Sequence, residues 1–319
     1  MPLLRFIPET TNVDFVKYRW WAFTLDGLLV LVSVVSIFWH GFNFGIDFTG
    51  GILMEVKSAQ VIDVGTLRSD IISLGFNDPV VQTFGGGTCN TPVGSCAMIR
   101  VQPKDAGPGV DQNVAEQASV RAIKAKLGTS YQYRRTEVVG PKVSSELLND
   151  GIIATLLAVA MISIYVAVRF EWQYGVGALI ATGHDVFVTA GFFSVLQLEF
   201  NIYTVASLLL LAGYSINDTV VVFDRLRENR RKYKRMSLPD MINLSTNQIA
   251  TRTTLVSAAT ALSVIPLLFG GPVLLNFSIA ILFGIVVGTF SSTYVAAMLL
   301  LYLPAVGGQV ESKAEEATA

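Results

Sequence analysis

The stretch that decides the fold class is residues 152–168, IIATLLAVAMISIYVAV, which contains no charged side chain. A hydrocarbon core about 30 Å thick needs about 20 apolar residues in a helix that rises 1.5 Å per residue, so this stretch predicts a membrane-spanning helix. Similar stretches lie at 20–39, 175–196, 201–223, 244–269 and 273–303. Only 15% of the 319 residues are charged, whereas an ordinary soluble protein has about 25%. The sequence therefore predicts a membrane α-helical bundle of six transmembrane helices.

Positive charges gather next to particular predicted spans. One short window holds seven of the 23 Lys and Arg, namely Arg225, Arg227, Arg230, Arg231, Lys232, Lys234 and Arg235. Because cytoplasmic connections are enriched in Lys and Arg, a basic loop at 225–240, the segment 1–19 and the tail 304–319 are predicted to be cytoplasmic, which makes the topology N-in and C-in. The tail is predicted to be disordered. Residues 20–39 are expected to stay as an anchor, because no small-residue cleavage site follows them.

Residues 40–150 are then predicted to form a domain on the opposite, exterior side of the membrane. Alternating apolar residues at 52–56 predict a strand, and residues 66–74 predict a helix that Gly75 ends. Further strands are predicted at 79–84, 97–102 and 131–139, with a second helix at 111–127. This order, βαββαβ, is the α+β ferredoxin-like arrangement, which fixes no function. The segment shows no metal-binding cluster, phosphate loop or nucleophile–base pair, so a binding or force-transmitting module is favoured over an enzyme.

Two pairs of residues in this domain are candidates for a structural role, one as a disulfide and the other as a hinge. Cys89 and Cys96 are the only cysteines, and an oxidising exterior permits a disulfide between them, with free thiols as the alternative. Gly50 and Gly51 follow the first predicted span. Because glycine tolerates backbone angles that other residues do not, they are a candidate hinge, with an ordinary turn into a strand as the alternative.

Ionisable residues also lie inside the predicted spans, where each costs at least about 2.5 kcal/mol and so requires a partner or a function. These residues are Asp26, His184, Asp185, Asp218 and Arg252. Asp218 lies about 10 Å along its helix from the basic loop, and Arg252 lies about 12 Å deep if its span begins near residue 244. The two opposite charges therefore reach the same level on neighbouring antiparallel helices. Asp26 lies near the cytoplasmic end of its span and is expected to extend toward the interface.

A static ion pair that fixes packing is one interpretation of Asp218 and Arg252, and a proton-carrying site is the other. Many polar residues accompany the pair, namely Ser215, Asn217, Thr219, Asn247, Gln248, Thr251 and Thr253. This polar surround favours a wet proton path in which Asp218 is the carrier and Arg252, which does not usefully lose its proton, is the counter-charge. His184 and Asp185 are candidates for a proton relay, and a hydrogen-bonded structural pair is the competing interpretation.

Several strings of residues resemble a known family. They are Gly45-Ile-Asp-Phe-Thr-Gly-Gly51, Val139-Gly-Pro-Lys-Val-Ser144, His184-Asp-Val186, Ser215-Ile-Asn-Asp-Thr-Val-Val-Val-Phe-Asp-Arg225 and Thr246-Asn-Gln-Ile-Ala-Thr-Arg-Thr253. In order and topology they resemble the SecF branch of the SecD/SecF protein-export family, which is related to the resistance-nodulation-division transporters. The stretch containing Cys89 and Cys96 is not part of that resemblance.

The resemblance implies a multi-pass protein of the bacterial inner membrane that works with SecD and the SecYEG channel. YajC and YidC are further candidate partners, and the substrate is an unfolded preprotein, which is drawn across the membrane with the proton-motive force. The resemblance implies that Asp218 and Arg252 belong to the proton-conducting machinery, and it implies no cofactor and no metal. A net charge of −1 gives no argument for a nucleic-acid partner. The rival functions are a small-molecule effluxer, a non-transporting assembly scaffold and an enzyme, for which no catalytic constellation is found.

Overall fold

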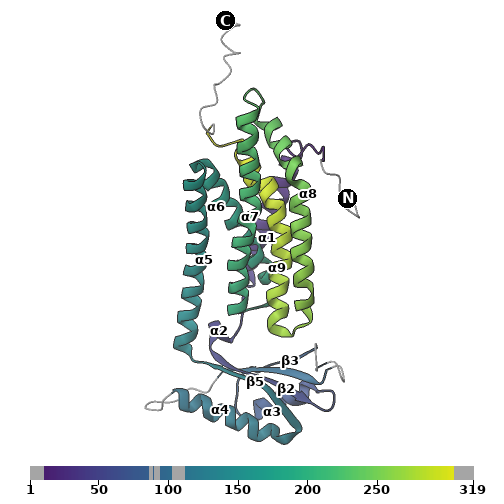
Figure 1. Ribbon diagram of the computed structural model, residues 1–319. Helices are drawn as coiled ribbons and strands as arrows, with labels where there is room; N and C mark the ends of the chain where they lie inside the picture. Colours follow the sequence, from purple (N-terminus) through teal and green to yellow (C-terminus); the bar gives the residue numbers. More distant parts are fainter. Residues whose placement is uncertain (1–10, 86–88, 90–93, 103–111, 305–319) are drawn as a thin grey trace.

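The computed structural model describes residues 11–85, 89, 94–102 and 112–304, so the predicted disordered tail lies almost wholly outside the described residues. Within the described part, six helices are long and apolar enough to cross a membrane, as the sequence predicted. They form one bundle, with the α/β domain at one end and the α7–α8 connection at the other (Figure 1). The helices are α1 (Arg19–Trp39), α5 (Pro141–Arg169), α6 (Trp172–Leu196), α7 (Ile202–Lys232), α8 (Leu238–Val264) extended by η3 (Ile265–Phe269), and α9 (Pro272–Ser291) extended by the π-helical η4 (Ser292–Ala296) and by α10 (Ala297–Leu299).

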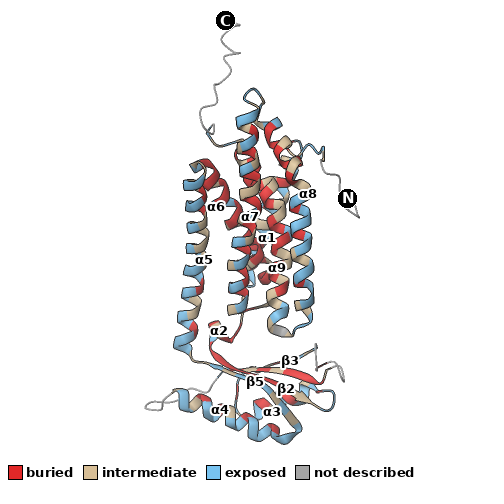
Figure 2. Ribbon diagram, viewed as in Figure 1, coloured by how far each residue is buried: buried red, intermediate tan, exposed pale blue. Residues whose placement is uncertain are grey.

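Helices α6 and α7 form the centre of the bundle (Figure 2). Half of the most apolar stretch of each is buried, against 22% for α1 and α5 and 11% for α8. The outer helices expose large apolar side chains, such as Leu156, Leu157 and Met161 of α5. A surface of this kind suits a hydrocarbon environment, in which apolar side chains need no covering.

The predicted basic loop at 225–240 is for the most part helical, which corrects the sequence-based boundary. Helix α7 continues to Lys232 and α8 begins at Leu238, so five residues separate them. The Arg, Lys and Glu residues of this window are good helix formers, and Arg225 forms an ion pair with Glu228 one turn later, at 2.5 Å. Helix α8 begins after Ser237, whose hydroxyl accepts from the Asp240 N–H at 3.3 Å.

The α/β domain contains the six elements that the sequence pattern predicted, in the same order. They are β2 (Gly51–Ser58), α3 (Val64–Ser73), β3 (Val80–Phe84), β4 (Cys96–Val101), α4 (Gln112–Leu127), which is followed by η2 (Gly128–Ser130), and β5 (Tyr131–Val139). The sheet order is β3-β4-β2-β5, and every neighbouring pair is antiparallel. Helices α3 and α4 cover one face of the sheet (Figure 1), and side chains such as Ile52, Leu67 and Ile123 are buried between the layers.

Cys89 and Cys96 are joined in a disulfide with 5.4 Å between their Cα atoms, which is the pairing that the sequence favoured over free thiols. The bond ties residue 89, in the connection after β3, to the first residue of β4. Arg134 lies beside it, with Nη1 at 2.6 Å from the Cys89 sulfur. This residue is the extra one of a bulge in β5, because Glu55 pairs with Arg135 while Val56 pairs with Tyr133.

Gly50 and Gly51 mark the entry into β2, and both have positive φ, +71° and +134°. A Cβ on Gly51 would lie 2.9 Å from the Val101 carbonyl oxygen in the neighbouring strand. The backbone conformation and this close approach therefore both require glycine. The hinge remains a prediction, since the geometry explains the glycines without any motion.

The domain is also held to the bundle through short segments at the end of the helices that faces it. Strand β1 (Asn43–Phe44) pairs in parallel with β6 (Glu199–Phe200), which connects α6 to α7. Next to it, the short helix α2 (Ile46–Thr49) carries Asp47, whose Oδ2 accepts from the N–H of Ile202 at 3.0 Å. Because Ile202 is the first residue of α7, the Asp47 carboxylate complements the N-terminal end of that helix.

Candidate functional site

Asp218 lies in the second half of α7 and is buried inside the bundle, with 4% of its surface exposed. Its Oδ2 atom is buried and has no hydrogen-bond partner within the described residues. The buried hydroxyls of Thr219 on the same helix and of Thr246 and Thr253 on α8 share that property. A buried carboxylate and the hydroxyl of the adjacent Thr219, both with unused hydrogen-bonding capacity, are suited to water and to a mobile proton.

Arg252 is present on α8 as predicted, but its side chain is exposed on the outside of the bundle. Among the described residues no ion pair joins it to Asp218 within the 4.0 Å limit for a salt bridge, although it is the charged group that acts electrostatically on Asp218. The depth argument placed the two charges at one level, but it did not establish which way each side chain points. The closed ion pair considered from the sequence is therefore not formed in this structure.

The remaining polar residues of the predicted surround divide into two groups. Thr219 and Thr253 are buried, whereas Asn217 is exposed and Thr251 is half-buried. Gln248 is used elsewhere, since its Oε1 accepts from Arg225 at 2.7 Å and from Asn229 at 2.8 Å.

Asn247 is also used elsewhere, because it holds the N-terminal segment. Its Oδ1 accepts from the N–H of Val13 at 2.8 Å, and its Nδ2 donates to the Val13 carbonyl at 2.7 Å. The polar surround of Asp218 is consequently smaller than the sequence predicted.

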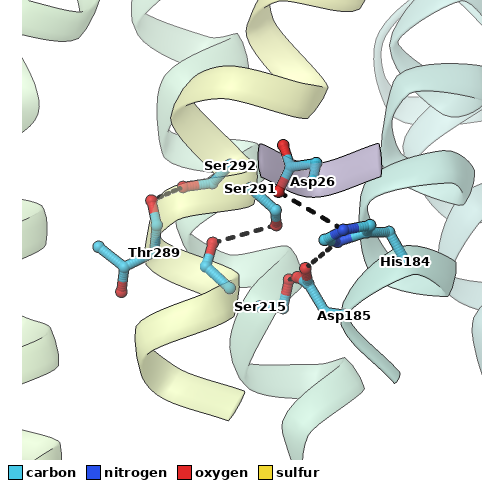
Figure 3. Close-up of polar contacts among 8 residues, drawn as sticks. Asp26, His184, Asp185, Ser215, Thr289, Ser291 and Ser292 are labelled. Atoms are coloured by element: carbon cyan, nitrogen blue, oxygen red, sulfur yellow. Dashed lines mark hydrogen bonds and ion pairs between the residues drawn. The ribbon is translucent and has the colours of Figure 1, made fainter. Parts of the chain in front are cut away.

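A second polar cluster lies between α1, α6 and α7 (Figure 3). His184 Nδ1 is 3.1 Å from Asp185 Oδ1, and His184 Nε2 is 3.6 Å from Asp26 Oδ1. Asp185 is fully buried, and its Oδ2 accepts from the Ser215 hydroxyl at 2.5 Å. Ser215 is one helical turn before Asp218 on α7, so the two sites are neighbours along that helix.

Asp26 corrects the sequence-based expectation, because it does not extend toward the interface. Its side chain is 8% exposed and points inward at His184. The direction follows from the packing of α1 against α6, where the absence of a side chain at Gly191 leaves room for Ser33. Asp26, Ser33 and Ser36 are the buried polar residues of α1, and their spacing places them toward one side of the helix. That polar stripe is visible in the sequence, and it would have predicted that Asp26 points into the bundle.

Helix α9 packs a surface of small residues against Asp185 and Ser215. A Cβ on Gly288 would lie 3.3 Å from Asp185 Oδ2, so this glycine lets α9 approach the carboxylate closely. The hydroxyls of Ser291 and Ser292 do not donate to the Asp185 carboxylate, because each donates to a backbone carbonyl of its own helix. The π-helical turn η4 begins directly after this contact.

Comparison with known proteins assigns the chain to a family. The model "Protein export membrane protein SecD/SecF, C-terminal" matches residues 119–305, and the model "SecD/SecF GG Motif" matches residues 35–60. The chain is 41% identical to protein translocase subunit SecF of Rhodobacter capsulatus over 310 residues, which cover 94% of this chain and 91% of that protein. This chain belongs to the SecD/SecF family.

Other members of the SecD/SecF family agree with this assignment. SecF of Rickettsia bellii is 38% identical over 93% of this chain and 95% of its own length. A crystal structure of SecDF from Thermus, described as a translocon-associated membrane protein, is 33% identical and has a TM-score of 0.79. The match covers 93% of this chain but 39% of the SecDF chain, so this chain spans less than half of that longer protein. Like other members of the SecD/SecF family, the chain is a multi-pass membrane protein.

The chemistry that these sites permit is proton binding. In the part of the chain that the structure describes, no group of three or more His, Cys, Asp and Glu is arranged to hold a metal ion. Buried carboxylates with unused oxygen atoms, by contrast, gain and lose protons at low structural cost when a compensating charge is near. Asp218 has Arg252 as its electrostatic partner, and Asp26 has His184.

Proposed function

We propose that this chain is the SecF subunit of the protein-export machinery of the bacterial inner membrane. Together with SecD it uses the proton-motive force to complete the translocation of unfolded preprotein that has entered the SecYEG channel. Near full-length similarity to proteins named SecF supports this function, and the SecDF neighbour, in which matching residues form 39% of a longer chain, supports SecD as a partner. YajC and YidC are further candidate partners.

The proposal includes the orientation of the chain. The α/β domain is a ferredoxin-like periplasmic module, and both ends of the chain are cytoplasmic. The strand order β3-β4-β2-β5 with both helices on one face supports the first statement. The position of Arg227, Arg230 and Arg231 at the end of the bundle opposite that domain supports the second.

Asp218 is the proton carrier in this proposal, and its burial with an unpartnered Oδ2 is the observation that supports it most directly. Arg252 is the counter-charge that turns toward Asp218 when the carboxylate ionises and away when it is protonated, and Thr219 lines the path. The exposed position of Arg252 corresponds to the arrangement in which the two charges are separated. A proton that crosses about 100 mV releases about 2.3 kcal/mol, which shifts a two-state equilibrium by about 50-fold.

A free energy of that size suits repeated small movements of the periplasmic domain that prevent a preprotein from sliding back. The competing function is a non-transporting scaffold on which the translocase assembles. In a scaffold, Asp218 would serve packing alone.

The deciding experiment is preprotein export in cells or inner-membrane vesicles that carry Asp218→Asn. Asp224→Asn is the matched control, because it makes the same chemical change on an exposed carboxylate of the same helix. We expect late-stage export to collapse in Asp218→Asn and to stay normal in the control, while both variants are inserted and copurify with SecD. Normal export by Asp218→Asn would leave the scaffold as the better account.

A further inference from the structure

The cluster of Asp26, His184 and Asp185 contains more buried titratable groups than a packing role requires. The three side chains are 8%, 8% and 0% exposed, and they come from two helices, α1 and α6. The described charged groups that act on Asp26 are His184 and Asp185. From α7 the cluster is faced by the hydroxyl of Ser215, and from α9 by Gly288, neither of which carries a charge.

The contacts of an ionised Asp185 assign one proton of the imidazole. Asp185 accepts from Ser215 through Oδ2, which leaves its Oδ1 facing His184 Nδ1 at 3.1 Å. A carboxylate oxygen accepts hydrogen bonds, so Nδ1 carries a proton and donates it to Asp185. The second ring nitrogen, Nε2, is then directed at Asp26.

Between His184 and Asp26 the structure leaves three polar atoms without a hydrogen-bond partner among the described residues. Nε2, Oδ1 and Oδ2 of Asp26 are all buried and have no hydrogen-bond partner within the described residues, and Nε2 is 3.6 Å from Oδ1. If neither side held a proton, a ring lone pair would face an ionised carboxylate. Two carboxylates would then lie inside the bundle beside a neutral imidazole, with no compensating positive charge among the described groups that act on Asp26.

We infer that Asp26 and His184 share one exchangeable proton and form a second proton-binding site, separate from Asp218. The proton has two resting places. On Nε2 it makes an imidazolium between two carboxylates, and on Asp26 it makes a neutral acid beside a neutral imidazole. Transfer between them breaks one N–H bond and forms one O–H bond, with no change in the number of protons.

The site connects two other parts of the chain. Asp26 belongs to α1, which leads directly to β1 and the GG motif, whereas Ser215 belongs to the helix of Asp218. Proton binding by this cluster is an equilibrium property and does not depend on the transport function proposed above.

The chain offers a clean probe, because it has only two histidines. His40 is exposed at the end of α1, so His40→Gln leaves His184 as the single histidine. The full chain with ¹⁵N-labelled histidine is placed in lipid nanodiscs and examined by NMR from about pH 5 to about pH 8, a range that brackets the titration of a free imidazole near 6.5. Infrared spectra of the same samples report any protonated carboxyl group.

We expect one proton on the pair throughout this range, seen either as a doubly protonated His184 or as a carboxylic-acid band that Asp26→Asn removes. In Asp26→Asn the amide replaces the anion and donates an N–H to Nε2, so His184 should lose its second proton within the range. Asp26→Glu should restore the parent behaviour. Asp218→Asn should leave the proton in place, which separates this result from failure of the proposed carrier.

Two results would overturn the inference. The first is a parent chain in which His184 releases a proton near pH 6.5 and no Asp26-dependent carboxylic-acid band remains. The second is a parent chain in which His184 is doubly protonated, together with an identical His184 titration in Asp26→Asn. The first result is measured on the chain with Asp26 intact, so it decides the question even where Asp26→Asn fails to fold.

Discussion

The contact between Asp47 and the first turn of α7 makes a sharp prediction about the junction of domain and bundle. Asp47→Ala removes the oxygen that accepts the Ile202 N–H at 3.0 Å, together with a negative charge at a helix N-terminus. Loss of an N-terminal acceptor costs about 1 kcal/mol, and loss of the favourable charge adds up to about 1 kcal/mol. The junction should therefore lose about 1–2 kcal/mol, a change of about 5- to 30-fold in its opening equilibrium.

Hydrogen exchange measured by mass spectrometry on the full chain tests this expectation. The peptide covering residues 198–206 should exchange about 5- to 30-fold faster in Asp47→Ala. Asp47→Asn keeps an oxygen acceptor and loses only the charge, so its effect should be smaller, about 2- to 5-fold. In Asp63→Ala, the matched control, the α3 cap that Asp63 makes with the Gly65 N–H is lost, so exchange should rise in α3 and stay unchanged at 198–206. Unchanged exchange at 198–206 in Asp47→Ala would refute the reasoning.

Three further predictions concern packing, pH and the disulfide. Gly191→Ala should lower the thermal unfolding temperature, because the added Cβ would lie 2.2 Å from a serine of α1, whereas Gly183→Ala, with nothing within 4 Å, should not. Burial raises the pKa of Glu199 above its ordinary value of 4.5, so the folded state binds more protons than the unfolded state. The thermal unfolding temperature should therefore fall as the pH rises from 4.5 through the raised pKa. Glu199→Gln should make the unfolding temperature less dependent on pH in this range. Reduction of the Cys89–Cys96 bond, or replacement of both cysteines by serine, should destabilise the α/β domain by about 2 kcal/mol, seen as an earlier unfolding transition in reducing buffer.

The sequence was sufficient for the elements and their order because the signals that define them are local. Gly75, for example, has φ at +82° just after α3, where its lack of a side chain predicted the end of that helix. The six spans follow from hydropathy, although α5 and α7 extend beyond the apolar stretches, and the elements of the α/β domain follow from periodicity.

The orientation of side chains inside the bundle could not be predicted in the same way. Rise per residue gave the depth of Asp218 and Arg252, but the direction of each side chain depends on which neighbouring helix it meets. Asp26 turns inward because Gly191 on another helix admits Ser33, a relation between residues 158 positions apart. The role of Asp47 was hidden for a related reason, since its partner is a backbone N–H, which every residue but proline offers.

The disulfide has a practical consequence for measuring the position of the α/β domain relative to the bundle. The chain has two cysteines, and they are bonded to each other, so no thiol is free to react. A cysteine introduced at Ser69 in α3 and another at Ser263 in α8, both exposed, would be the only sites for thiol-directed spin labels or fluorophores. Distances across the domain–bundle junction are thereby measurable without first deleting native residues.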